Sequence, residues 1–434
     1  SWEYKVGIFH DHADHEINLS GEFSPILKAG GFDAVIGNPP YVLIADTDAK
    51  KYLHSFYKHS TGKPDLYRYF IERSHQILKP KGQFGFIIPN TLLTIPASQK
   101  LREYLLTDGG LTQIVHFLGA VFSQVSVNSI IIFTVKGLTN QSIEIIEDKN
   151  KIPSLITLNA AIQQKRFIEK NLWLSNEGIK FSLSFTTEIA AIIEKLKIQS
   201  VELSSIAKYS LGMQIYHHTM HTQQQIKERV YHSDTQADEH FWPESTGRNV
   251  LRYHFINTFK SYAAYGKWCY SKPTWEFCSE PRILIREITS RTLMGVTTNT
   301  IHIPTKAVII IIPQKIHLHY LLGLLNSQLM GFYVRTTGEK GTQRLFPRIS
   351  LTTLRKLPIY QIDFNNPTDK ASHDKIVQLV EQMLAFNKQL AAAKAPQTKT
   401  LLKRRIDATD KQIDEWVYQL YDLTAVEIEI VKRG

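Results

Sequence analysis

The sequence predicts an α/β protein, in which an open sheet with helices on its faces is followed by an α+β domain and a helical C-terminal segment. Up to about residue 137, short apolar runs alternate with segments of helical periodicity. Residues 151–360 hold short strand-like pieces among long polar, aromatic and histidine-rich stretches. Apolar residues then recur at helical spacing towards the C-terminus. We therefore expect three parts, which are residues 1–150, 151–360 and 361–434.

The first part contains several strand and helix signals in alternation. Phe32–Gly37 is a short apolar run that ends in glycine, which predicts a buried parallel strand. Residues 65–78 predict a helix with Asp65 as its N-cap, because Pro80 and Gly82 follow just beyond its end. Three further strands are predicted at residues 84–89, 114–117 and 129–135.

The second and third parts have a different texture. Residues 282–286 and 307–312 read as strands, and the apolar stretch 320–327 reads as a helix. Residues 361–368 form a turn-rich link. Two helices separated near Pro396 should then make a helical hairpin or a short coiled coil, since apolar side chains repeat at helical spacing in both (Ile376, Leu379, Val380, Met383 and Leu384; Ile406, Ile413, Trp416, Val417 and Leu420).

Charge and composition restrict the class of partner. The formal charge is +11 and the pI is about 9.3, which favours an anionic partner but does not separate DNA from RNA or from a membrane surface. No apolar run approaches the length of a membrane span. Two cysteines, Cys269 and Cys278, are too few for a disulfide framework or a four-cysteine zinc site, so we expect a reducing, cytoplasmic setting.

The segment Asn38-Pro39-Pro40-Tyr41 directly follows the first predicted strand, and strand carboxyl ends are where open α/β sheets bind ligands. Two consecutive prolines stiffen the loop. The Asn38 side chain and the Pro39 carbonyl offer two acceptors, and Tyr41 offers a flat ring. Two acceptors and a stacking plane suit an exocyclic amino group on a flat heterocycle. The amino nitrogen can attack an electrophile first and lose its proton afterwards, so no strong base is needed.

Residues 31–42 resemble the catalytic motif of amino-group DNA methyltransferases, of the kind in which the S-adenosylmethionine (AdoMet) half precedes the motif and a target-recognition domain follows. Residues 65–72 and 78–90 follow the order and spacing of that family's next helix and strand. Residues 119–128 resemble the segment whose aromatic residue stacks on the extruded base. The resemblance implies AdoMet-dependent methylation of adenine N6 in double-stranded DNA. Its site would comprise Asn38, Pro39, Pro40 and Tyr41 in catalysis, Tyr41 and Phe122 in base stacking, and Asn38 and Asp65 at the cofactor edge.

The later parts of the chain resemble the same family. Residues 281–286 and 324–329 are similar to pieces of the specificity domain of type II restriction–modification enzymes, and residues 413–424 are similar to the helix that closes such chains. Between 151 and 360, basic and aromatic residues interleave, as at Arg252 and Tyr253. Arg and Lys can neutralise phosphates or read guanine edges. The candidates for DNA binding are Arg286, Lys340, Arg344 and Arg348.

One departure from the family concerns the cofactor. Only 37 residues precede Asn38, and they contain no Gly-x-Gly pattern. We therefore expect a missing N-terminal half or a partner chain to supply the AdoMet pocket. Three alternatives stay open: a DNA-binding specificity module without methylation activity of its own, an enzyme that methylates an RNA base or protein glutamine, and a parent enzyme that also cuts DNA.

Each signal also has a plainer interpretation. The Asn-Pro-Pro-Tyr segment could be an ordinary turn, Asp65 a plain helix cap, and Phe122 a core residue. The run from His10 to His15 matches a metallo-hydrolase ligand pattern, but so few residues precede it that they cannot build the strand framework such ligands need. We expect no metal site there.

Overall fold

The computed structural model describes residues 23–44, 46–60, 65–122, 128–176, 178–183, 185–288, 290–338 and 349–433. The chain forms two compact units, residues 1–187 and 188–434. Each unit has hydrophobic clusters of its own.

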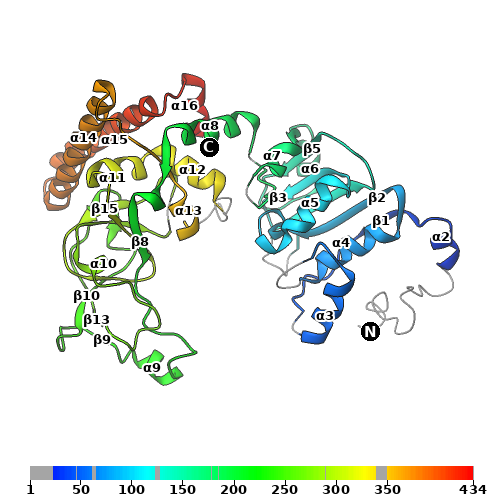
Figure 1. Ribbon diagram of the computed structural model, residues 1–434, viewed down its shortest axis with the longest axis horizontal. Helices are drawn as coiled ribbons and strands as arrows, with labels where there is room; N and C mark the ends of the chain where they lie inside the picture. The colour runs from blue at the N-terminus through cyan, green and yellow to red at the C-terminus, as the bar shows by residue number, and fades with distance from the viewer. Residues whose placement is uncertain are drawn as a thin grey trace. The chain divides into compact units, whose positions relative to one another are not determined.

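The first unit is built on an open six-stranded sheet of order β1-β2-β4-β3-β5-β6 (Figure 1). β1 is parallel to β2, and β3 is parallel to β5, whereas the other neighbours are antiparallel. The structure confirms the predicted strands and extends the sheet beyond residue 150 with β6. The strands are β1 (Phe32–Gly37), β2 (Leu78–Pro89), β3 (Leu111–Phe117), β4 (Ser129–Val135), β5 (Ser142–Asp148) and β6 (Arg166–Glu169).

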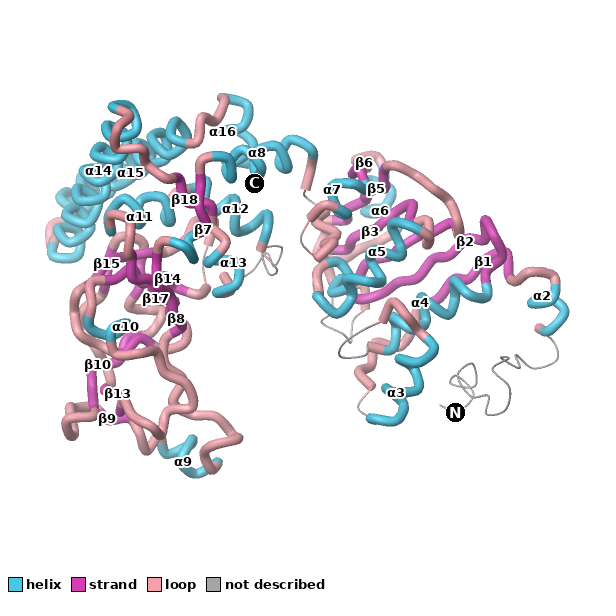
Figure 2. Tube along the Cα trace, viewed as in Figure 1, coloured by secondary structure: helices cyan, strands magenta, loops and turns pink. Residues whose placement is uncertain are grey.

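Helices cover both faces of this sheet (Figure 2). On one face, α4, α5 and α7 pack against Ile114, Ile130 and Ile132. The alternate residues Val115 and Ile131 point to the other face and meet α6. This alternation is what the strand period of two requires, and it confirms the open α/β fold. The helices of this unit are α2 (Ser24–Lys28), α3 (Thr47–Phe56), α4 (Leu66–Ile77), η1 (Asn90–Leu93), η2 (Pro96–Ser98), α5 (Gln99–Thr107), α6 (Leu155–Ile162) and α7 (Lys170–Leu174).

The burial expected for β1 is wrong, although its position and its parallel pairing are confirmed. Ile36 is 84% exposed, and Ala34 is also exposed. The reason is the strand order: β1 pairs only with β2 among the described strands, so its other edge is open. The apolar run thus correctly predicts a strand. It does not predict burial, because this strand has only one neighbouring strand among the described residues.

A fully buried arginine connects three segments of the first unit. Arg102 on α5 donates from Nε to the Ile179 carbonyl at 2.6 Å, and from Nη2 to the Gly178 carbonyl at 2.7 Å. Its Nη1 donates to the carbonyls of Leu92 and Ile95, both at 2.8 Å. Burial lowers the pKa of Arg102 to about 10, so it is still charged at neutral pH. One guanidinium thus satisfies four carbonyls at places where the chain leaves regular structure.

The second unit contains four small sheets with strand orders β15-β14-β17-β8, β16-β10-β13-β9, β11-β12 and β18-β7. The expected strands near 282–286 and 307–312 are β14 and β17. They pair with each other at the centre of the β15-β14-β17-β8 sheet. Every residue of β14 up to Ile285 is buried. The strands are β7 (Ser200–Glu202), β8 (Ala207–Leu211), β9 (His232–Ser233), β10 (Phe241–Ser245), β11 (Val250–Leu251), β12 (His254–Phe255), β13 (Tyr262–Ala264), β14 (Arg282–Arg286), β15 (Gly295–Thr298), β16 (Ile303–Pro304), β17 (Val308–Pro313) and β18 (Pro358–Tyr360).

Long helices complete the second unit. The expected apolar helix is α11, and the expected hairpin is α14 and α15, which lie side by side (Figure 1) and are joined by three residues. A third helix, α16, was not predicted. The helices are α8 (Thr187–Ile198), η3 (Leu203–Ser205), α9 (Gln223–Glu228), α10 (Glu276–Ser279), α11 (Leu318–Asn326), α12 (Gln328–Thr337), α13 (Leu351–Arg355), α14 (Pro367–Ala392), α15 (Pro396–Leu420) and α16 (Ala425–Arg433). Across the described ranges, no helix combines the length and apolar character needed to cross a bilayer.

Polar contacts join α15 to the rest of the second unit. Asp414 accepts hydrogen bonds from the Gln328 backbone N–H at 2.8 Å and from Gln328 Nε2 at 2.7 Å. Arg252 pairs with Asp410 and donates to the Asn326 carbonyl at 2.7 Å. The hairpin is therefore bonded to the α11–α12 junction and to the loop at Arg252.

Asp414 makes the stability of the second unit depend on pH. Burial raises the pKa of this carboxyl to about 6, and the like charge of Asp410 adds to the effect, against Gln328 and Arg252. Below about pH 4 the group is neutral whether folded or unfolded. As the pH rises to 6 and beyond, the unfolded chain loses the proton first, so stability falls by about 3 kcal/mol.

Asp414→Asn removes this titration, and a flip of the Gln328 amide can restore both hydrogen bonds. We expect the variant to be more stable than the wild type at pH 7 and equal to it near pH 4. Urea denaturation across this pH range measures the difference. A difference that does not change with pH would contradict the prediction.

Candidate functional site

The carboxyl ends of three strands meet at one edge of the first sheet. β1 and β2 are parallel, and two antiparallel pairings through β4 make β3 parallel to them as well. The register places Pro89 opposite Ser129, so β4 begins at the edge where β2 ends. The segments that follow β1, β2 and β3 therefore emerge together. This edge holds residues 38–41, Asn90 and residues 118–122.

Tyr41 is fixed against the end of β2. The β1–β2 ladder stops at the pair Gly37 and Phe86, and the next residue, Ile87, accepts a hydrogen bond from the Tyr41 hydroxyl at 2.9 Å. The Tyr41 ring meets Tyr67 edge-on, with centroids 6.4 Å apart. Burial raises the pKa of Tyr41 to about 12, so the hydroxyl remains a donor at neutral pH. The hydroxyl at the far end of the ring therefore holds the Tyr41 side chain against β2.

The Asn38 side chain, unlike that of Tyr41, is not anchored by the described residues. It is exposed, whereas Pro39 is buried and Pro40 is exposed. Within the described ranges, no hydrogen bond occupies the Asn38 carboxamide. A polar side chain on a proline-stiffened loop, next to an anchored ring, is thus available to a ligand.

Asp65 lies at the start of α4 and is joined to the same loop. The Leu66 N–H donates to the Val42 carbonyl at 3.0 Å, and Leu43 forms an isolated bridge with Asp65. Asp65 occupies the predicted N-cap position, but its side chain makes no capping hydrogen bond. Its buried Oδ1 has no partner among the described residues, and burial raises the pKa of the carboxyl despite the nearby Arg68 guanidinium. An acceptor without a partner at this edge suits a ligand that donates hydrogen bonds.

Phe122 lies on the segment that follows β3. The segment is held against β5, because the Leu118 N–H donates to the Asp148 carbonyl at 2.9 Å. A Cβ on Gly119 would lie 2.3 Å from the Asn150 carbonyl oxygen, so this glycine permits close backbone packing. Phe122 is half-buried at the same sheet edge as Tyr41. The described residues show no ring contact between the two, so their joint stacking on a base stays a prediction.

The DNA-binding candidates are unevenly placed. Arg286 ends β14, is half-buried, and runs its stem along Gly247. Lys340, Arg344 and Arg348 lie outside the described residues, as does the run from His10 to His15. In the part of the chain that is described, no group of three or more His, Cys, Asp or Glu residues is arranged to hold a metal ion.

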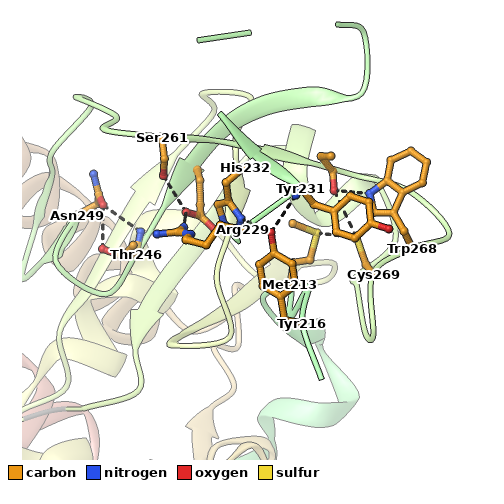
Figure 3. Close-up of polar contacts among 12 residues, drawn as sticks. Met213, Tyr216, Arg229, Tyr231, His232, Thr246, Asn249, Ser261, Trp268 and Cys269 are labelled. Atoms are coloured by element: carbon orange, nitrogen blue, oxygen red, sulfur yellow. Dashed lines mark hydrogen bonds and ion pairs between the residues drawn. The ribbon is translucent and has the colours of Figure 1, made fainter. Parts of the chain in front are cut away.

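Several polar residues of the second unit have internal roles. His232 contacts the Tyr216 hydroxyl at 3.0 Å and Glu244 at 3.2 Å, and Ser261 donates to Glu244 at 2.9 Å (Figure 3). Burial disfavours the charged Glu244, but His232 and Ser261 outweigh it and lower its pKa. Tyr253 is fully buried. Sequence reasoning missed the network formed by Tyr216, His232, Glu244 and Ser261, because these residues are separated in the chain and match no motif.

Two family models match separate stretches of the chain. Residues 7–122 match the Eco57I restriction-modification methylase, and residues 242–359 match the TaqI-like C-terminal specificity domain. The first match contains the Asn38–Tyr41 loop, Asp65 and Phe122. The second contains Arg286.

Curated relatives are similar over most of this chain. The restriction–modification protein RM.MjaORFECS2P of Methanocaldococcus jannaschii is 27% identical over 78% of this chain and 28% of its own length. The type II restriction enzyme and methyltransferase RM.Eco57I of Escherichia coli is 21% identical, over 92% and 47% respectively. The type II methyltransferase M.HincII of Haemophilus influenzae is 24% identical, over 86% and 83%. The chain thus spans less than half the length of the first two.

Solved structures share the fold. The type IIL restriction–modification enzyme MmeI, in complex with DNA, aligns with 97% of this chain and 59% of its own at a TM-score of 0.59 and 13% identity. A nuclease-deletion mutant of the type ISP enzyme LlaGI, with a DNA substrate mimic, aligns with 88% of this chain and 37% of its own at a TM-score of 0.50 and 11% identity.

Proposed function

From the premise that this chain belongs to the restriction–modification methyltransferases with a TaqI-like specificity domain, we propose that it supplies the catalytic loop and the DNA recognition of an adenine-N6 DNA methyltransferase. The observation that carries this proposal is the site at the carboxyl edge of the first sheet. There the Asn38 carboxamide, which has no hydrogen-bond partner among the described residues, lies near a ring that Ile87 anchors.

The loop suits a flipped adenine. A base stacked in a duplex is out of reach of such a loop, so the target has to be extruded. The Asn38 side-chain oxygen and the Pro39 carbonyl would accept the two amino protons, which leaves the nitrogen lone pair free to point towards the methyl donor. Tyr41 and Phe122 would hold the two faces of the ring. After nitrogen attacks, the extra proton leaves to water.

AdoMet, when bound, would supply the electrophilic methyl group, and its sulfur would leave as a neutral thioether with the electron pair of the broken methyl–sulfur bond. Asn38 and Asp65 are the described residues that fit AdoMet. The Oδ1 atom of Asp65 has no partner among the described residues and can accept a hydrogen bond at the same edge. Among the described strands β1 pairs only with β2, which supports a further part of the proposal, that a missing N-terminal half or a partner chain completes the AdoMet pocket.

Double-stranded DNA is the proposed substrate, and residues 151–360 are its proposed recognition region. Arg286, Lys340, Arg344 and Arg348 are proposed to contact phosphates or base edges. A cytoplasmic location, where such DNA lies, is part of the same proposal.

The runner-up is a DNA-binding specificity module that transfers no methyl group on its own. The open β1 edge favours it, because that edge is where further sheet would have to be added. Titration of this chain with labelled AdoMet separates the two, since tight binding by the chain alone would contradict the module.

The experiment that tests the main proposal identifies the methylated product. The intact enzyme is incubated with labelled AdoMet and, in parallel reactions, with duplex DNA, with RNA or with a glutamine-containing protein. Each product is digested to nucleosides or amino acids for mass spectrometry. We expect N6-methyladenine. N4-methylcytosine would overturn the adenine assignment, and label found only in RNA or in protein glutamine would overturn the DNA assignment.

A further inference from the structure

One end of the α14–α15 hairpin concentrates positive charge. Between residues 382 and 406 there are six Lys and Arg residues and no Asp or Glu, so these 25 residues carry six of the eleven net charges of the chain. All six are exposed. We call them the basic tip: Lys388, Lys394, Lys399, Lys403, Arg404 and Arg405.

The fold gathers these six charges at one place. α14 ends at Ala392 and α15 begins at Pro396, so the two long helices reverse direction over three residues. At 1.5 Å per helical residue, the outermost members, Lys388 and Arg405, lie only about 6 and 14 Å from the turn. In the described part of the chain, none of the six forms a salt bridge, although Arg405 lies over the Phe386 ring at 5.8 Å.

A run of charge is often only a solvated surface, but here it opposes the stability of its own helix. Lys399 lies in the first turn of α15, where the helix dipole already favours negative charge. That turn contains no acidic residue, and the N-cap residue Ala395 makes no capping hydrogen bond. Lys399 and Lys403 are four residues apart on one helix, so they repel each other. Helix stability therefore does not explain the charge at this end of the hairpin.

We propose that the basic tip binds the phosphate backbone of duplex DNA outside the bases that the enzyme reads. The inference rests on the proposed function, which makes duplex DNA the anionic partner. Duplex DNA carries one negative charge per about 1.7 Å of axis, which matches a cluster of closely spaced cations without acidic neighbours. Such contacts add affinity and salt dependence without sequence preference.

The test is the double variant Lys399→Gln/Lys403→Gln in the full chain. Because it removes a repulsive pair, we expect it to fold at least as stably as the wild type. Binding to a 30-base-pair duplex of arbitrary sequence is measured by fluorescence anisotropy over a series of salt concentrations. Each lost phosphate contact lowers the slope of log affinity against log salt by about 0.9, so we expect a decrease of about 1 to 2 and a several-fold weaker affinity.

The matched control is Lys370→Gln/Lys411→Gln, which removes two exposed lysines of the same two helices away from the tip. Its affinity and salt slope should stay close to those of the wild type. Equal losses in both doubles, or no loss in the tip double, would overturn the inference while the proposed function stands. A tip double that loses binding to polyglutamate but not to DNA would assign the tip to an acidic protein instead. Failure of the wild-type chain to bind duplex DNA would count against the proposed function itself.

Discussion

Asn38→Ala is expected to reduce methyl transfer by the intact enzyme by about 100- to 1000-fold, the range seen when one preorganised polar group is removed from a reaction centre. The Asn38 side chain is exposed and has no hydrogen-bond partner in the described structure, so its loss should not disturb folding. DNA binding should change little, because it is proposed to depend on other residues. Labelled methyl incorporation and anisotropy measure the two quantities.

Two further variants make this prediction specific. Asn38→Asp keeps an acceptor oxygen, so it should retain more activity than the alanine variant. Asn159→Ala applies the same truncation to an exposed residue of α6 in the same unit and should leave the rate unchanged. Methylation by Asn38→Ala at the wild-type rate would refute the role assigned to the loop.

Arg102→Met is expected to destabilise the first unit by about 4 kcal/mol or more. The substitution keeps much of the side-chain volume but leaves four carbonyls, two in buried and two in partly buried hydrogen bonds, without their donor. Each unsatisfied buried group costs roughly 1–3 kcal/mol. The effect should be confined to residues 1–187, because the second unit has a separate core.

Hydrogen–deuterium exchange, followed peptide by peptide, measures this prediction unit by unit. Exchange should accelerate in α5 and in the strands that it covers, but not in α14 or α15. Arg102→Lys keeps the charge but cannot reach four carbonyls, so it should also destabilise the unit, though by less. Lys100→Met, at the exposed neighbouring position, is the control for loss of charge on α5. Unchanged exchange in Arg102→Met would show that the four hydrogen bonds contribute little net stability.

Local signals allowed much of this structure to be predicted. The strand Phe32–Gly37, the helix after Asp65 and the α14–α15 hairpin each follow from the pattern of a single segment. The Asn38–Tyr41 loop could be singled out because its four residues are contiguous. What could not be predicted depends on partners distant in sequence. Ile36 is exposed because the strand order leaves β1 at an edge, and no property of the apolar run itself reveals that.

The same limit applies to side-chain contacts. Residues 324–329 and 413–424 each carry a recognisable pattern, yet neither pattern shows that Gln328 and Asp414 are bonded to each other across 86 residues. Likewise, the four carbonyls that Arg102 holds come from two segments, residues 92–95 and residues 178–179, that pattern alone does not bring together. Phe122 could be assigned to a stacking role by resemblance, but the geometry of that role depends on a base that has to be present.

The bonds between α15 and the body of the second unit have a consequence for engineering. Transplanting only residues 188–360 into a related enzyme would separate Gln328 from Asp414 and Arg252 from Asp410, so the half-buried Arg252 would lose its carboxylate partner and Gln328 its two hydrogen bonds. Chimeras should therefore exchange residues 187–434 as one cassette, so that the junction lies directly before α8 and leaves this helix intact. The specificity-domain match and the closing helices lie in one compact structural unit.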